Sequence, residues 1–233
     1  GCIQLSPFPS IMDLEEAYKI DYHGYTKAND RGIIFVMLQK FLISFLKRRL
    51  INKLHHNSHV LDIGCGNGYL LETIRNCGIN NIFGIDFSSQ ACSLLKQKKI
   101  SFFKGTFMQF KSDQYYDLII MDNYLEHTID PIYELKKVYS LLKNKGTLYG
   151  EVPGFDSWER KLFKKYWGGN HVPRHTFQFT QEYLKKMFIE AGFKKIKILH
   201  QINTAHIVLS IQNILNRNGK LKVKLKHGRF KWF

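Results

Sequence analysis

The stretch 60–68, VLDIGCGNG, constrains the fold of this chain more than any other. Its apolar residues are typical of a buried strand, and Gly64, Gly66 and Gly68 let the backbone turn tightly past a ligand before a helix begins near Tyr69. A second apolar strand, 81–86, ends on Asp86, 18 residues after Gly68. An acid at about this spacing receives the ribose hydroxyls in doubly wound folds. The pattern therefore predicts a nucleotide-type cofactor site.

The rest of the sequence indicates an α/β fold. After residue 56, apolar runs alternate with helical patterns, which favours a parallel sheet covered by helices on both faces. The length of 233 residues suits one such domain. We expect an N-terminal lid and helix at 1–55, a core at 56–203 with an insertion at 153–179, and a basic C-terminal extension at 204–233.

The glycine spacing separates two kinds of nucleotide site. Dinucleotide folds use G-x-G-x-x-G around a pyrophosphate, whereas this chain has G-x-G-x-G with Asp62 two residues before Gly64. An acid there would repel a pyrophosphate and suits a cationic ligand. The loop therefore resembles motif I of the class I S-adenosylmethionine (SAM) dependent methyltransferases.

Two later segments narrow this resemblance. The string D-x-I-x-x-x-x-x-L-E-H-x-x-D-P begins at Asp117, and the stretch 175–180, HTFQFT, precedes a helix that ends near Ala191. Both are similar to the small-molecule branch that contains ubiquinone-type and surface-sugar O-methyltransferases. The similarity covers about residues 56–200 and implies a Rossmann-like, doubly wound, mostly parallel sheet of seven strands.

The resemblance implies SAM as cofactor and S-adenosylhomocysteine as product. Many relatives carry an acid where this chain has Thr106 and Phe107, so the adenine contact there is expected from backbone alone. The residues that match the family's cofactor contacts are Tyr22 and Tyr25 in the lid, Asp62, Gly64, Cys65, Gly66 and Gly68 around the methionine part, Asp86 at the ribose, Phe87, Thr106 and Phe107 at the adenine, and Asn123 and Tyr124 at the sulfonium. The simplest role for the Cys65 side chain is that of a small buried filler.

On the acceptor side, His127 and His175 are the candidate general bases. A structural role, in which His127 fixes its loop through a hydrogen bond, is the alternative. Glu126 is expected to support a helix start. The insertion is dense in aromatic and cationic residues, which suit a sugar carrying phosphate or carboxylate, although core packing would explain most of them. Its candidate substrate contacts are Trp167, His171 and Arg174.

No metal is expected. The four cysteines form no C-x-x-C pair, and no acids and histidines recur at ligand spacing near the fourth strand. Activity should therefore survive a strong chelator.

The net charge of +16 is concentrated late in the chain, since no acid follows Glu190 and ten lysines and arginines do. This indicates either compositional drift or a basic tail that contacts an anionic membrane. Leu221, Val223 and Leu225 alternate with lysines, which predicts a strand at the sheet edge or else a solvated arm. The apolar segment 33–46 is too broken to span a bilayer and should form a helix on the core or on a membrane surface. A cytoplasmic protein, peripheral to the inner membrane, fits this pattern.

The leading functional hypothesis is methyl transfer from SAM to a hydroxyl of a small polar acceptor. A sugar, a nucleotide sugar or a phosphate-bearing precursor of a bacterial surface polysaccharide would suit the insertion. A quinone- or lipid-pathway O-methyltransferase is the alternative within enzymes. An RNA-directed methyltransferase or a nucleic-acid-binding module is a third hypothesis, but residues 122–125, DNYL, lack the Pro-Pro-aromatic signature of base methylation. No nucleic-acid partner is therefore expected.

Overall fold

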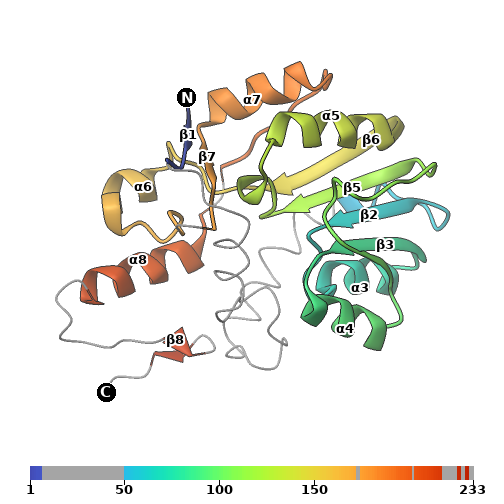
Figure 1. Ribbon diagram of the computed structural model, residues 1–233, viewed down its shortest axis with the longest axis horizontal. Helices are drawn as coiled ribbons and strands as arrows, with labels where there is room; N and C mark the ends of the chain where they lie inside the picture. Colours follow the sequence, from blue (N-terminus) through green and yellow to red (C-terminus); the bar gives the residue numbers. More distant parts are fainter. Residues whose placement is uncertain (7–49, 172–173, 201, 217–224, 227–228, 231–233) are drawn as a thin grey trace.

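A five-stranded parallel sheet forms the centre of the molecule (Figure 1). The computed structural model describes residues 1–6, 50–171, 174–200, 202–216, 225–226 and 229–230. Tyr22, Tyr25 and the expected helix at 33–46 lie outside the described residues. The strand order is β4-β3-β2-β5-β6, with β2 at His59–Ile63, β3 at Asn81–Asp86, β4 at Ser101–Lys104, β5 at Tyr116–Asp122 and β6 at Leu142–Glu151.

This strand order confirms the doubly wound α/β fold. The chain moves outward from β2 to β3 and β4, and then returns to place β5 on the other side of β2. Folds of this kind bind ligands beside the carboxyl ends of the strands, where the order reverses. The expected count of seven strands is not confirmed, because the described part of the central sheet has five.

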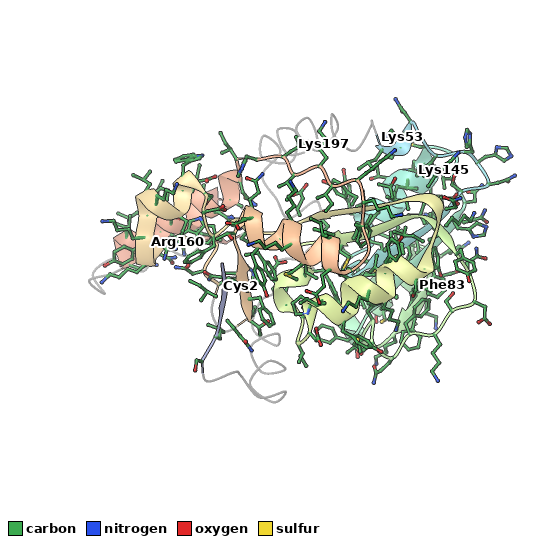
Figure 2. The ribbon with its side chains drawn as sticks, turned by 90° about the horizontal axis from the view of Figure 1, so that it is seen from above. Cys2, Lys53, Phe83, Lys145, Arg160 and Lys197 are labelled. Carbon is green, nitrogen blue, oxygen red and sulfur yellow. The ribbon has the colours of Figure 1, made fainter. Side chains whose placement is uncertain are left out.

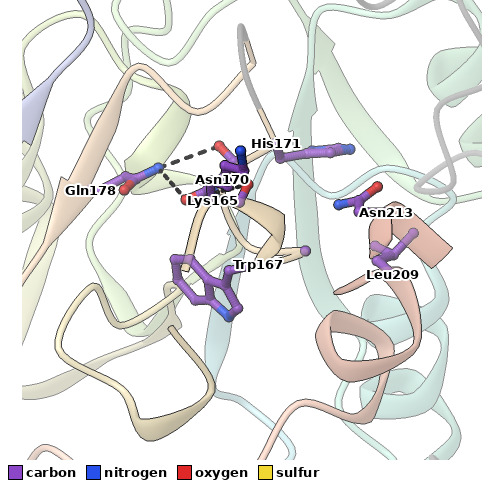
Figure 3. A pocket seen from close by; sticks show the side chains of 8 residues that line it. Lys165, Trp167, Asn170, His171, Gln178, Leu209 and Asn213 are labelled. Carbon is purple, nitrogen blue, oxygen red and sulfur yellow. Dashed lines mark hydrogen bonds between the residues drawn. The ribbon is translucent and has the colours of Figure 1, made fainter. Parts of the chain in front are cut away.

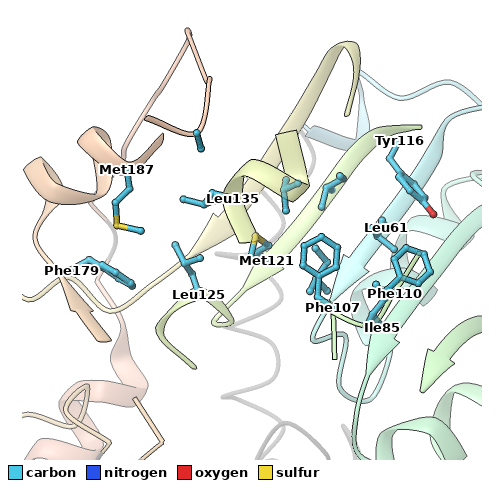
Figure 4. Packing of buried hydrophobic residues seen from close by; sticks show 14 residues of the cluster. Leu61, Ile85, Phe107, Phe110, Tyr116, Met121, Leu125, Leu135, Phe179 and Met187 are labelled. Atoms are coloured by element: carbon cyan, nitrogen blue, oxygen red, sulfur yellow. The ribbon is translucent and has the colours of Figure 1, made fainter. Parts of the chain in front are cut away.

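Helices cover both faces of the sheet because its strands are apolar on both sides. Val60, Leu118 and Ile120 pack with α3 (Tyr69–Asn76) and α4 (Ser89–Gln97). The alternate residues Leu61 and Ile119 belong to a second cluster with residues of α5 (Pro131–Leu141) and α7 (Gln181–Glu190). Figure 4 shows Leu61, Leu135 of α5 and Met187 of α7 from this cluster. The cofactor loops are thus anchored in two separate layers of core.

Side-chain caps fix where three of these helices begin. Ser88 accepts hydrogen bonds from the backbone at the start of α4, and Asp130 accepts one at the start of α5, where Pro131 occupies the first turn. Thr180 accepts a hydrogen bond from the N–H of Tyr183 at 3.3 Å at the start of α7.

The insertion lies beyond the carboxyl ends of the strands. It contains α6 (Trp158–Phe163), the short helix η4 (Lys164–Tyr166) and β7 (Phe177–Phe179). β7 pairs antiparallel with β1 (Cys2–Gln4). Figure 2 shows Arg160 of α6 and Lys145 of β6 at opposite ends of the molecule. The aromatic and cationic residues of the insertion therefore lie on the side of the sheet where the strands end.

Helix α8 (Thr204–Asn216) packs against the insertion. The N–H of Gly168 donates to Ser210 Oγ at 2.8 Å, and a Cβ atom on Gly168 would lie 2.5 Å from the carbonyl oxygen of His206. The close approach requires glycine. The first part of the expected basic extension is consequently a helix docked on the domain.

The described part of the tail does not join the central sheet. Leu225–Lys226 (β8) pairs antiparallel with Arg229–Phe230 (β9) instead, which corrects the edge-strand prediction for these residues. Pairing with a segment so near in sequence closes a far smaller loop than reaching the sheet would. Among the described helices, none has the length and apolar character needed to cross a membrane.

Candidate active site

The glycine turn after β2 has the backbone conformation that the sequence predicts. Gly64, Gly66 and Gly68 have φ angles of 73°, 52° and 68°, which favour glycine. The N–H groups of Gly64 and Cys65 donate to the carbonyl oxygen of Ile85 at 2.8 and 3.1 Å. The turn is therefore fastened to the end of β3.

Asp86 connects this turn to the start of α4. Its Oδ2 accepts the N–H of Gly66 and its Oδ1 accepts the N–H of Ser88, both at 2.9 Å. The side chain is buried, which raises the pKa of its carboxyl, and the two hydrogen bonds oppose that shift. A carboxylate oxygen has two lone pairs, so each oxygen can accept one further hydrogen bond from a ligand hydroxyl.

The expected adenine contacts divide into exposed and buried side chains. Phe87 is 47% exposed, and the Thr106 hydroxyl hydrogen-bonds Gln109 at 3.2 Å. Phe107 is 1% exposed and packs in the core, with Lys137 Nζ 4.6 Å from its ring centroid. The buried ring of Phe107 leaves its backbone for the adenine contact, which is the form of contact expected from the sequence and stays a prediction.

Cys65 also turns inward, because its Sγ packs against Gly84, where a Cβ atom would lie 2.7 Å away. Burial raises the pKa of its thiol well above the usual value, as expected for a filler rather than a reactive group. Asp62 lies buried in β2 directly before the glycine turn.

Asn123 and Tyr124 follow β5 beside this turn. Asn123 has a φ of 51°, and its N–H donates to the carbonyl oxygen of Glu151 at 2.9 Å. The ring of Tyr124 covers Gly64, where a Cβ atom would lie 2.6 Å from Tyr124 Cδ2. The Tyr124 hydroxyl bonds the buried Glu134, whose pKa is raised to about 7 by burial. The expected cofactor residues among the described ones thus follow or end the strands β2, β3, β4 and β5.

His127 and His175 meet on the acceptor side although they are far apart in sequence. Their ring centroids are 4.7 Å apart. His127 Nδ1 lies 2.9 Å from the carbonyl oxygen of Arg174, and His175 Nδ1 lies 2.8 Å from that of Gly169. Because a carbonyl only accepts, each Nδ1 carries the proton and each Nε2 presents a lone pair.

Glu126 lies between the two imidazoles. It is 1% exposed, and neither of its carboxylate oxygens has a hydrogen-bond partner among the described residues. Each histidine Nε2 is 3.9 Å from Glu126 Oε1. Burial raises the pKa of Glu126 to about 8 and lowers those of His127 and His175 to about 4 and about 2. The three groups are therefore mainly neutral at pH 7, and no ion pair forms.

This grouping bears on two expectations. Glu126 lies in the first turn of the short helix η3 (Leu125–His127), as expected for a residue at a helix start, while Asp130 provides the cap of α5. No acids and histidines were expected at ligand spacing, but the chain brings one acid and two histidines to within 4.8 Å of one another, since the insertion returns to the end of β5.

Thr176 holds this return in place, a role that no motif or pattern in the sequence predicted. Its N–H donates to the carbonyl oxygen of Glu126 at 2.9 Å, and its hydroxyl lies 3.0 Å from the same oxygen and 2.8 Å from that of Thr128.

A pocket of about 440 Å³ opens between the insertion and α8 (Figure 3). The residues that line it are Lys165, Trp167, Gly168, Asn170, His171, Gln178, Leu209 and Asn213. Leu209 and Asn213 were missed, because the sequence assigned their segment to the extension.

The three expected substrate contacts differ in their placement. His171 lines the pocket, and its ring centroid is 5.1 Å from that of His175, so the pocket adjoins the histidine pair. Arg174 contacts His171, with Nη1 and Nε2 3.4 Å apart. Trp167 also lines the pocket, with a side chain that is only 2% exposed, and its contact with a substrate stays a prediction.

Comparison with known proteins agrees with this geometry. The family described as "Methyltransferase domain" matches residues 37–198. A Haloferax volcanii methyltransferase, solved in complex with the Trm112 methyltransferase activator, has a TM-score of 0.55 and 19% identity, covering 73% of this chain and 74% of that chain. That likeness concerns the fold.

Curated relatives match shorter parts of the chain. The ubiquinone biosynthesis O-methyltransferase of Rickettsia typhi is 25% identical over 124 residues, which is 49% of each protein. The mRNA-capping enzyme of African swine fever virus is 38% identical over 63 residues, 27% of this chain and 7% of that enzyme. The chain thus spans about half the length of the former relative and a small part of the latter.

Proposed function

The chain belongs to the Methyltransferase domain family, and from that premise we propose that it methylates a hydroxyl of a small polar acceptor bound between the insertion and α8. It is a class I SAM-dependent methyltransferase with SAM as the methyl donor. The acceptor that suits the pocket is a sugar, a nucleotide sugar or a phosphate-bearing precursor of a bacterial surface polysaccharide.

Residues at the ends of β2, β3 and β5 would hold the donor. Asp86 keeps lone pairs for the ribose hydroxyls, and buried Asp62 places negative charge near a cationic ligand. Phe87 offers an exposed ring for the adenine. The other proposed contacts are Gly64, Cys65, Gly66 and Gly68 through their backbone, the Thr106–Phe107 backbone, Asn123 and Tyr124, with the lid residues Tyr22 and Tyr25 outside the described part.

The lining of the pocket carries the acceptor proposal. Six of its eight residues have side chains that can hydrogen-bond: Lys165, Trp167, Asn170, His171, Gln178 and Asn213. Amides and an imidazole can bind several hydroxyls, and a lysine suits a phosphate or carboxylate. Such a lining would leave unpaired polar groups around a purely apolar ligand, which is unfavourable.

Methyl transfer to a hydroxyl also requires removal of its proton. SAM supplies an electrophilic methyl group and leaves as S-adenosylhomocysteine. His127 or His175 could accept the hydroxyl proton at Nε2, since both Nδ1 atoms are occupied with carbonyl oxygens. Their lowered pKa values make them weak bases, so alignment of the reacting atoms would supply much of the rate.

A phenolic acceptor of the quinone pathway is the second candidate. The observation that favours it is the resemblance to relatives named ubiquinone biosynthesis O-methyltransferase. A phenol ionises more readily than a sugar hydroxyl and would need less help from a base.

Mass spectrometry of reactions with SAM tests the proposal. We would offer a panel of nucleotide sugars and, in parallel, polyprenylated catechols, and look for the mass of one added methyl group. Lys165→Met should raise the KM for phosphate-bearing acceptors about tenfold or more, whereas Lys161→Met, on α6 outside the lining, should not. Methylation of catechols alone, with no effect of Lys165→Met, would favour the second candidate.

We further propose a cytoplasmic enzyme that contacts the anionic inner membrane through its basic C-terminal residues. The charge distribution supports this, because ten cationic side chains and no acids follow Glu190. Sedimentation with vesicles containing anionic lipid, at low and high salt, measures the contact directly.

A further inference from the structure

We propose that Glu126, His127 and His175 form a binding site for one divalent transition-metal ion of the zinc type. The binding of the ion follows from these side chains alone. Its role deepens the proposed function and rests on it.

The ligand set is that of a catalytic metal site. Two imidazole nitrogens and one carboxylate suit Zn²⁺ and its first-row neighbours, whereas Mg²⁺ prefers oxygen ligands. One ligand atom from each of the three residues lies within 4.8 Å of the others. Three residues that converge in this way, two from the short helix after β5 and one from the insertion, enclose a point that each can reach.

Small movements would bring the ligands to bonding distance. Ligands about 2.0–2.1 Å from a tetrahedral Zn²⁺ are about 3.3 Å apart, compared with 3.9 Å between Glu126 Oε1 and each histidine Nε2. Side-chain rotations can close about 0.6 Å. Glu126 is able to move, because its carboxylate has no hydrogen bond to break among the described residues.

The surroundings of the histidines are those of metal ligands. Metal-binding histidines usually donate their other N–H to a carbonyl or carboxylate, which fixes the ring and directs the free lone pair to the ion. His127 and His175 both donate Nδ1–H to backbone carbonyl oxygens, of Arg174 and Gly169. Each Nε2 thereby carries the ring lone pair through which an imidazole can bind an ion.

The buried carboxylate of Glu126 is the independent observation. A fully buried, unpartnered carboxyl group costs about 1–3 kcal/mol or more, so such groups call for an explanation. An ion would provide its partner. The nearby carboxylates of Asp122 and Glu151 disfavour a negative charge on Glu126 and would favour a cation beside it. Arg174 is the opposing charge, and its guanidinium points to His171.

The position of the site assigns a role to the ion. Three protein ligands leave a fourth position open, as in catalytic rather than structural zinc sites. The adjoining pocket would present the acceptor hydroxyl there. Metal coordination lowers the pKa of a bound hydroxyl, which would offset the weak basicity of the histidines. The hydroxyl proton then leaves to solvent, the oxygen forms the new C–O bond, and the S–C bond of SAM breaks.

Cobalt titration of the chelator-treated protein tests the inference. Co²⁺ bound by two imidazoles and a carboxylate absorbs visible light, and Zn²⁺ should compete it away. We expect one ion per chain by elemental analysis. Glu126→Gln should weaken binding at least about 100-fold, since even loss of an outer-shell partner costs 10- to 100-fold. Glu134→Gln, another buried glutamate, and His171→Gln, which neighbours the cluster, should bind as the unmodified protein does.

Metal-binding measurements on the unmodified protein can overturn the inference by themselves, so the test does not depend on whether a variant folds. Much less than one ion per chain, no visible band, or no rise in melting temperature with Zn²⁺ would each show that Glu126 is simply a buried neutral acid. SAM affinity and methylation of the acceptor panel are measured separately. Metal binding without methylation of sugars would refute the proposed acceptor and leave the metal site standing, while methylation undiminished in metal-free protein would refute the role of the ion.

Discussion

Asp86→Asn tests the arrangement at the cofactor end of the sheet. The carboxylate accepts two backbone N–H groups, from Gly66 and Ser88, at 2.9 Å each. An asparagine has only one acceptor oxygen, so its NH₂ group must face one of these donors. One buried N–H then loses its partner, which costs about 1–3 kcal/mol. A domain of this size should melt about 2–4 °C lower for each kcal/mol lost.

The same substitution should weaken SAM binding beyond its effect on stability. Both ribose hydroxyls would lose a charged acceptor, and a loss of about 1–3 kcal/mol corresponds to about 5- to 150-fold in affinity. Isothermal titration calorimetry with SAM and S-adenosylhomocysteine measures this change, with thermal melting to show that the variant is folded.

Asp117→Asn is the matched control. Asp117 also accepts two hydrogen bonds, from the N–H of His59 at 2.7 Å and from Lys143 Nζ at 2.8 Å, but it lies at the start of β5, away from the cofactor loops. The control should lose stability and keep its SAM affinity. Unchanged affinity in a folded Asp86→Asn protein would remove Asp86 from the site.

Three further predictions concern stability. Lys143 holds the pKa of Asp117 below its usual value despite burial, so Asp117→Asn should remove about 1 kcal/mol of stability. This loss should be constant above about pH 5 and should vanish as the pH falls through the pKa of Asp117 in the folded state. Urea unfolding of both proteins at several pH values measures it. Gly168→Ala should destabilise by about 1–3 kcal/mol and raise the acceptor KM, since its Cβ would overlap α8, while Gly154→Ala, with only ordinary contacts, should melt normally. Deletion of residues 219–233 should leave the melting temperature unchanged, because the described part of this tail pairs only with itself. The deletion should weaken salt-sensitive binding to anionic vesicles. A clear drop in melting temperature would show that the tail belongs to the folded core.

The cofactor end of the sheet was predictable because its signals are local. Gly64 and Asn123 directly follow apolar strands and Asp86 ends one, and parallel strands bring their carboxyl ends to one edge. The structure confirms that these residues gather there. Their individual contacts with SAM stay predictions. Phe107 lies in the expected loop with its ring packed in the core, which leaves the backbone contact that the sequence predicts there.

The acceptor side was less predictable because its contacts are distant in sequence. Glu126 and His175 meet only because the insertion turns back to the end of β5, where Thr176 fastens it. Nothing in the periodicity of the insertion encodes that path. Leu209 was missed for the same reason, as the docking of α8 depends on a close approach at Gly168 that no local pattern reveals.

The pocket is lined by two separate segments of the chain, and this arrangement affects how acceptor specificity can change between related enzymes. Its walls come from residues 165–178 and 209–213, whereas the proposed donor contacts in the described residues all precede residue 125. An exchange of α8 between related proteins would replace one wall and leave the glycine turn, Asp86 and the Thr176 bonds intact. Chimeras made in this way should inherit their donor affinity from one parent and their acceptor preference from both.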